Sequence, residues 1–258
     1  MIYQTIRAET EGGIARITLA RPEVMNALNA QMRAELLHAM RAASKAARVV
    51  VITGEGRAFC SGQDLGDGAR LSAPDLERTL RDEYEPLLKA IYDCPAPVVA
   101  AVNGPAAGAG ANLALAADVV IAAESASFIQ AFTRIGLMPD AGGTWWLPRQ
   151  IGQARAMGAM LFADRIPARQ AADWGMIWDC LPDADFAAGV EARVAQLAAG
   201  PSVAYRGIKR ALRESWGQGL EAQLSLEAKL QGECGLTQDF KEGVIAFLEK
   251  RPARFEGR

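Results

Sequence analysis

The sequence predicts an α/β fold in which a largely parallel sheet is covered by helices on both faces. Three segments are apolar along almost their whole length and end in glycine or alanine: RVVVITG (48–54), PVVAAVNG (97–104) and DVVIAA (118–123). Uninterrupted apolar strands are typical of parallel sheets that are buried on both sides. Small-residue helical sequence lies between the last two, and the order strand, helix, strand predicts right-handed crossovers.

The N-terminal elements follow from residue spacing. Residues 12–22 alternate and end at a proline, which predicts a strand with Ala15, Ile17 and Leu19 on one face. Residues 29–47 predict a helix, with Asn29 as a candidate N-cap. Its apolar stripe at helical spacing consists of Met32, Leu36, Met40 and Ala43.

Beyond residue 148 the pattern becomes mostly helical. Helices are predicted over 147–162, 167–175 and 183–199, with a short strand-like segment at 176–181. After 200–202, three more helical stretches end near Lys250.

The chain is therefore expected to have two regions. Residues 1–200 would form the α/β core that binds and converts the substrate, and residues 201–258 would form a helical region for oligomerisation.

The bulk properties exclude several classes of partner. A net charge of −2 gives no electrostatic reason to bind nucleic acid or an anionic membrane. The apolar stretch 97–123 is too interrupted to span a membrane, because it contains Asn103, Asn112 and Asp118. The N-terminus carries charges where a signal peptide needs an apolar run. The four cysteines stand far apart, which suits a reducing cytoplasm, where we expect the protein to act: Cys60, Cys94, Cys180 and Cys234.

Common catalytic devices are missing from the sequence. The single histidine, His38, lies inside the predicted helix with no serine or cysteine partner pattern, so a Ser-His or Cys-His mechanism and a histidine-based metal site are not expected. The glycine-rich stretch 54–62 lacks the lysine and hydroxyl residue of a Walker loop. Residues 104–112 lack the third glycine of a dinucleotide fingerprint. No metal and no cofactor are expected.

Asp140 is the carboxylate that raises a question. It stands between Pro139 and two glycines in GLMPDAGGT (136–144), a stretch otherwise free of charge. It could cap the helix that follows, since aspartate accepts hydrogen bonds from free N–H groups of a first turn. It could instead be an acid/base group held in apolar surroundings. Spacing alone leaves both interpretations open.

Two glycine-rich turns follow predicted strands and have a similar form. The first is GRAFCSGQDL (56–65) and the second is NGPAAGAGANLAL (103–115), which leads into a helix. Glycine and alanine allow a ligand to approach the backbone closely. Backbone N–H groups from two loops, aimed at one point, would form an oxyanion hole, although either loop alone is also consistent with an ordinary turn.

These motifs resemble the crotonase (enoyl-CoA hydratase/isomerase) superfamily in order and spacing. The opening ITLARPEVMNALN (17–29) and the closing EGVIAFLEKR (242–251) match as well, so the resemblance covers nearly the whole chain. It implies a spiral of strand–strand–helix turns, with C-terminal helices that build homotrimers or dimers of trimers. It also implies acyl-CoA thioester substrates, with CoA as part of the substrate rather than a cofactor.

The resemblance assigns roles to individual residues. The oxyanion donors would be the backbone N–H groups of Gln63 and Ala109. Hydratases of the family hold water between two glutamates, and this chain has Asn112 and Phe132 at those positions. Family isomerases use a carboxylate as a base where this chain has Asp140. The resemblance therefore implies isomerisation by a 1,3-proton shift, and not hydration.

A finer pattern over residues 132–149 and 154–181 is similar to the bacterial ring-1,2-epoxyphenylacetyl-CoA isomerases of phenylacetate degradation. Their reaction would convert the ring epoxide to oxepin-CoA. Three alternatives stay open. They are a 3-enoyl to 2-enoyl isomerase of linear acyl-CoAs, a crotonase-like binding protein without turnover, and an aryl-CoA dehalogenase, for which His38 is badly placed.

The resemblance also implies a substrate-binding set. Phe132, Leu137, Trp145 and Trp146 would form an apolar wall that raises the pKa of Asp140 by desolvation, although each could equally be ordinary core. Phe247 and Lys250 would reach CoA from a neighbouring subunit. The adenine and pantetheine pocket for CoA would be formed by Val24, Ser61, Asp64 and Leu65, and the other substrate-binding positions are Gly110 and Asn112.

Overall fold

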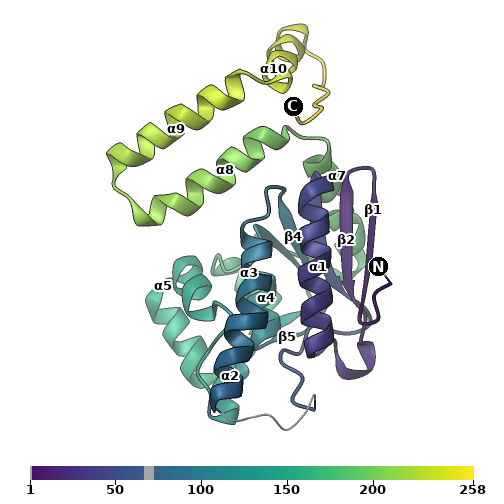
Figure 1. The fold of residues 1–258 in the computed structure, drawn as a ribbon, viewed down its shortest axis with the longest axis vertical. Coiled ribbons are helices and arrows are strands. Elements are labelled where there is room, and N and C mark those ends of the chain that lie inside the picture. Colours follow the sequence, from purple (N-terminus) through teal and green to yellow (C-terminus); the bar gives the residue numbers. More distant parts are fainter. Residues whose placement is uncertain (1, 67–72) are drawn as a thin grey trace.

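The computed structural model describes residues 2–66 and 73–258, drawn as a ribbon in Figure 1. Its main sheet has the strand order β1-β2-β3-β4-β6-β9, and every neighbouring pair is parallel except β1 and β2. A second sheet has the order β5-β7-β8. The strands are β1 (Ile6–Glu11), β2 (Ile14–Leu19), β3 (Val49–Gly54), β4 (Val98–Val102), β5 (Ala106–Ala107), β6 (Val119–Ala123), β7 (Ser127–Ile129), β8 (Ile166–Pro167) and β9 (Asp179–Leu181).

Helices cover both faces of the main sheet. The α-helices are α1 (Ala30–Ala46), α2 (Ala73–Thr79), α3 (Glu85–Tyr92), α4 (Ala109–Leu115), α5 (Gly143–Phe162), α6 (Ala168–Asp173), α7 (Asp183–Ala198), α8 (Ser202–Glu214), α9 (Leu220–Gly235) and α10 (Gln238–Glu249). Shorter helical turns are η1 (Pro22–Val24), η2 (Leu80–Tyr84), η3 (Ala131–Ile135) and η4 (Ser215–Gly217).

The side chains of β3 alternate between the two faces of the sheet, which explains why helices pack on both faces. Val50 and Ile52 join the core that contains α1, whereas Val49 and Val51 join a second core with α7. Successive side chains of a strand point to opposite faces, so an all-apolar strand is stable only where both faces are packed. This confirms the prediction from the apolar strands.

The helix predicted over 29–47 is confirmed as α1. Asn29 has extended backbone angles, and its side chain accepts a hydrogen bond from the backbone N–H of Met32 at 2.8 Å. The predicted stripe is buried. A satisfied N-cap of this kind contributes about 1 kcal/mol to stability.

Some elements were not predicted. In β1 only Ile6 is buried, so no apolar alternation identifies the strand, and pairing with β2 forms it. Helix α5 begins at Gly143, several residues before the predicted start, and residues 73–92 form helices that no sequence pattern predicted. Gly152 has a left-handed φ of 77° inside α5, where it kinks the helix.

The C-terminal helices extend beyond the sheet, with α8 and α9 side by side (Figure 1). Lys209 on α8 attaches them to the core, because its buried ammonium donates to the backbone carbonyl of Ala96 at 2.7 Å and pairs with Asp118. Leu226 and Leu230 of α9 are buried within the chain. Within the two described ranges, no helix is long and apolar enough to cross a membrane.

Candidate active site

The two glycine-rich turns meet beside the main sheet. The backbone N–H of Phe59 donates to the carbonyl of Pro105 at 3.1 Å, and the N–H of Ala107 donates to Cys60 at 2.9 Å. On its other side the first turn is held by the N–H of Leu28, which donates to Gly62 at 2.8 Å. These bonds place the backbone of residues 62–63 against the start of α4.

Glycine is required at the point of closest approach. Gly62 has φ +97°, and a Cβ there would lie 2.8 Å from the carbonyl oxygen of Ala107 and 3.5 Å from the nitrogen of Ala109. Gly110 is equally constrained, since its Cβ would lie within 3 Å of three atoms of Cys60. The two turns are thus packed backbone to backbone, a separation that no larger residue permits.

Two backbone N–H groups remain unpaired at this junction. In the described part of the chain, neither the N–H of Gln63 nor that of Ala109 has a hydrogen-bond acceptor. Both belong to backbone that the surrounding bonds hold rigid. They can therefore donate to a ligand oxygen without reorganisation, as an oxyanion hole requires.

Asp140 does not cap the following helix. The N-cap position of α5 is Gly142, and no side chain caps it. The Oδ1 atom of Asp140 is buried with no partner in the residues described. Ala141 and Gly142, which follow it, both have left-handed φ values, 47° and 80°. For alanine this conformation costs on the order of 1–2 kcal/mol, so the surrounding structure imposes the turn that presents the carboxylate.

Burial raises the pKa of Asp140 to about 6. The cause is desolvation by burial, and no cation among residues 2–66 and 73–258 pairs with the carboxylate. A carboxylate with a pKa near 6 is ionised at neutral pH and remains basic enough to accept a proton from a weak carbon acid. The cap interpretation is wrong, because the N-cap of α5 is Gly142 and no side chain caps it, whereas the acid/base role of Asp140 stays a prediction.

A buried amide chain holds the Asp140 segment in place. The Nδ2 group of Asn112 donates to the backbone carbonyl of Asp140 at 2.7 Å, and Gln130 Nε2 donates to Asn112 Oδ1 at 2.8 Å. Asn112 is 0% exposed and Gln130 is 1% exposed. Gly143 leaves room for the amide, since a Cβ there would lie 2.5 Å from Asn112 Nδ2. The Asn112 side chain is thus bonded at both ends within the protein.

The side chain of Gln63 is braced on the other wall. Its Oε1 atom accepts a hydrogen bond from Arg33 Nη1 at 2.8 Å and from the Tyr84 hydroxyl at 2.6 Å. Arg33 also donates to the carbonyl of Leu28 and pairs with Glu83. This cluster ties the first glycine-rich turn to α1 and η2.

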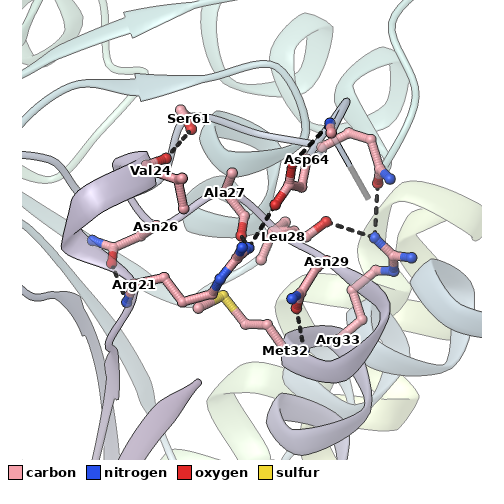
Figure 2. A network of polar contacts seen from close by, with 12 residues as sticks. Arg21, Val24, Asn26, Ala27, Leu28, Asn29, Met32, Arg33, Ser61 and Asp64 are labelled. Atoms are coloured by element: carbon pink, nitrogen blue, oxygen red, sulfur yellow. Dashed lines mark hydrogen bonds and ion pairs between the residues drawn. The ribbon is translucent and has the colours of Figure 1, made fainter. Parts of the chain in front are cut away.

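Three of the residues expected at the CoA pocket lie together in Figure 2. The hydroxyl of Ser61 donates to the backbone carbonyl of Val24 at 3.2 Å, and Asp64 pairs with Arg21 at 2.8 Å. The hydrogen bond from Arg21 is the main reason that the pKa of Asp64 lies below its usual range. Leu65 is exposed at the end of the same segment. The structure brings this predicted set to one edge of the site.

The expected apolar wall is only partly assembled. Phe132 is buried, and its ring lies 3.8 Å from where a Cβ on Gly108 would stand. Leu137 and Trp145 are partly exposed, and the Arg149 guanidinium stacks 3.3 Å from the Trp145 ring centroid. Trp146 packs against the main core instead.

Phe247 and Lys250 lie away from the site of their own chain. Both are at the end of α10, which Figure 1 places apart from α4 and α5, and Phe247 is 82% exposed. A role for these residues requires a second subunit.

No sequence pattern predicted the residues that support the site, namely Gln130, Arg33 and Tyr84. Gln130 lies in an unremarkable turn, and Tyr84 belongs to a segment without an assigned pattern. The one available signal was Arg33, a charged residue next to the apolar stripe of its helix. Residues 2–66 and 73–258 contain no cluster of three histidine, cysteine, aspartate or glutamate residues that could hold a metal ion.

Known proteins resemble this chain over its whole length. Residues 9–258 match the family described as enoyl-CoA hydratase/isomerase. A Rhodobacter capsulatus protein named "Probable enoyl-CoA hydratase" is 65% identical, with 100% of each chain covered. An Escherichia coli protein named 1,2-epoxyphenylacetyl-CoA isomerase is 43% identical, also over 100% of each chain. The crystal structure of an enoyl-CoA hydratase from Bacillus anthracis has a TM-score of 0.94 and 31% identity, covering 99% of this chain and 100% of that one.

Proposed function

The chain is an enzyme of the enoyl-CoA hydratase/isomerase family with the crotonase fold, and we propose that it is an isomerase that shifts a double bond of an acyl-CoA thioester. The observation that carries this proposal is the buried, unpartnered Oδ1 atom of Asp140, on a segment bonded to α4, together with two backbone N–H groups, of Gln63 and Ala109, that have no acceptor among the described residues. We further propose ring-1,2-epoxyphenylacetyl-CoA as the substrate and oxepin-CoA as the product, in phenylacetate catabolism.

The backbone N–H groups of Gln63 and Ala109 would hold the thioester carbonyl oxygen. A thioester α-carbon is too weak an acid for a carboxylate in water, so the enolate must be stabilised. Each preorganised donor contributes on the order of 3–4 kcal/mol to such a transition state.

Asp140 would transfer the proton in both steps. It removes a proton from the CH₂ next to the thioester and returns it to the γ-carbon, two atoms along the acyl group. With the ring epoxide as substrate, the C–C bond of the epoxide also breaks as the ring expands to the seven-membered oxepin, and the oxygen stays on the β-carbon. The double bond then lies in conjugation with the carbonyl. A positioned general base adds roughly 10²–10⁴-fold to the rate.

The residues at the other two positions support isomerisation over hydration. A hydratase needs a second carboxylate to hold water. The amide of Asn112 is bonded at both ends, and Phe132 is buried and apolar. The name of the Rhodobacter capsulatus relative favours hydration, which is the second candidate function.

A panel of acyl-CoAs tests the reaction type. We expect ring-1,2-epoxyphenylacetyl-CoA or linear 3-enoyl-CoAs to give a new conjugated chromophore, followed by diode-array absorbance. Crotonyl-CoA should give little or no 3-hydroxyacyl product. Hydration at a rate near that of isomerisation would contradict the roles given to Asn112 and Phe132. No turnover of any thioester would instead support a binding protein.

The rate should depend on pH through Asp140. The base acts in its ionised form, so kcat/KM is expected to rise about tenfold per pH unit below pH 6 and to level off above it. Initial rates between pH 4.5 and 8.5 measure this dependence. A midpoint near 4 would show that the carboxylate is hydrated in the working enzyme.

We also propose that the enzyme is at least trimeric. The C-terminal helices expose a large apolar surface, which is normally covered in a stable protein. Its residues include Leu220, Leu224, Leu236, Phe240, Phe247 and Leu248.

Light scattering on the intact protein is expected to give at least three times the monomer mass. Truncation before Leu220 should cause aggregation or loss of CoA affinity. A monomeric mass with full activity would show that α9 and α10 need no neighbouring subunit.

A further inference from the structure

The orientation of the Gln63 side-chain amide is determined by its two neighbours. Its Oε1 atom faces both Arg33 Nη1 and the Tyr84 hydroxyl, at 2.8 and 2.6 Å. Arginine has only donors, so the atom that faces it must be the amide oxygen and cannot be the nitrogen. Arg33 and Tyr84 are each only 4% exposed, and this makes them a rigid brace.

The other end of this amide is left without a partner. In the part of the chain that the structure describes, no acceptor bonds Gln63 Nε2, and the residue is exposed. Two N–H groups are therefore available for a ligand in a fixed direction. Because the oxygen is already occupied, the amide cannot rotate to present an acceptor instead.

This amide belongs to a residue at the junction of the two glycine-rich turns. The backbone N–H of the same residue is one of the two unpaired donors at the junction of the glycine-rich turns. On the far side, Tyr84 is within electrostatic reach of Asp140: burial raises the pKa of the Tyr84 phenol, and the charge of Asp140 adds to this effect. Gln63 thus links one of the two unpaired backbone donors, in its own backbone, to Tyr84, which is within electrostatic reach of Asp140.

We propose that the Gln63 side-chain amide donates a hydrogen bond to an oxygen on the β-carbon of the acyl group, and so selects oxygenated acyl-CoAs. The inference rests on the proposed function, because it assigns the thioester carbonyl to the backbone N–H of the same residue. An oxygen on the β-carbon is two carbons from that carbonyl carbon, and the glutamine side chain spans a comparable length. An aryl epoxide or a cyclic enol ether has its oxygen at this position.

A matched pair of saturated thioesters tests the selection without turnover. Tetrahydropyran-2-ylacetyl-CoA has a ring oxygen on its β-carbon, and cyclohexylacetyl-CoA has the same ring size without it. Calorimetry is expected to show about two- to tenfold tighter binding of the oxygenated ligand. In Gln63→Glu this preference should be lost or reversed, because the carboxylate can still accept from Arg33 and Tyr84 but no longer donates.

Tyr84→Phe is the control variant. It removes one donor to Gln63 Oε1 and leaves Nε2 in place. The affinity for both thioesters should therefore fall by the same factor, and the preference for the oxygenated ligand should remain. If the role of Gln63 were purely structural, Gln63→Glu would also change the affinity for both ligands by the same factor.

Turnover provides a second measurement. The ratio of kcat/KM for ring-1,2-epoxyphenylacetyl-CoA over cyclohex-1-enylacetyl-CoA is expected to fall about tenfold or more in Gln63→Glu. Equal binding of the saturated pair by the wild-type protein would overturn the inference. A binding preference that depends on Gln63, without isomerisation of either substrate, would uphold it and refute the proposed function instead.

Discussion

Asp140→Asn is expected to lower isomerase turnover by at least about 100-fold while leaving the dissociation constant for acyl-CoA nearly unchanged. Asparagine has nearly the same size and polarity but cannot accept a proton. The hydrogen bonds that hold the segment use the backbone carbonyl of Asp140, so they persist in the variant. Steady-state rates and calorimetric binding separate the two effects.

The same variant should become relatively more stable as the pH rises. Burial raises the pKa of Asp140 from 3.8 to about 6, so the folded state binds this proton more tightly than the unfolded chain does. In the wild-type protein, the stabilisation that comes from the protonated Asp140 carboxyl is complete below pH 3.8 and is lost as the pH rises through 6. The asparagine variant does not lose it. The difference corresponds to roughly 3 kcal/mol at neutral pH. Melting temperatures of variant and wild type at pH 4.5 and 7.5 should therefore diverge in favour of the variant.

Asp164→Asn is the matched control, because Asp164 is an exposed carboxylate beyond the end of α5. It should not change turnover. Full activity of Asp140→Asn would rule out the proposed base.

Gly62→Ala is expected to lower turnover by about 10²–10³-fold, the effect of losing an oxyanion donor. Its methyl group would stand 2.8 Å from the carbonyl oxygen of Ala107, too close for any real contact. The two turns must separate, which moves the N–H groups of Gln63 and Ala109 out of reach of one oxygen. Rates with the best substrate of the panel measure the loss.

The control for this variant is Gly12→Ala in the turn between β1 and β2. Gly12 also has a left-handed φ, +57°, but a Cβ there meets nothing within 4 Å. Both variants place an alanine at a positive φ, whereas only Gly62→Ala brings a methyl group against the carbonyl oxygen of Ala107. If both variants lost turnover to the same small extent, the thioester carbonyl oxygen of the substrate would have to bind elsewhere.

The sequence alone predicted the elements whose signal is local. The strands β3, β4 and β6 are almost entirely apolar, and α1 has its cap at the preceding residue and its stripe within its own 17 residues. The edge strand β1 was missed because its side chains are mostly polar and exposed, and only pairing with β2 makes it a strand.

The candidate site was predictable to a similar extent. The two glycine-rich turns and the isolated Asp140 stand out in the sequence, because glycine runs and a carboxylate in apolar surroundings are local features. The sequence did not decide whether Asp140 caps the following helix or acts as a base. The cap was excluded only when the structure placed Gly142 at the start of α5.

By itself, then, the sequence determined the layered α/β plan, the two turns and the residue types that face them. Only the tertiary structure decided the pKa of Asp140, since desolvation depends on what surrounds the carboxylate and not on its neighbours along the chain. It also decided which side chains hold the site in place. Gln130 is hydrogen-bonded to Asn112, 18 positions away in the sequence, and Arg33 is hydrogen-bonded to Gln63, 30 positions away. Hydrogen bonds between residues so far apart exist only after folding brings their backbones together, so no local pattern records them.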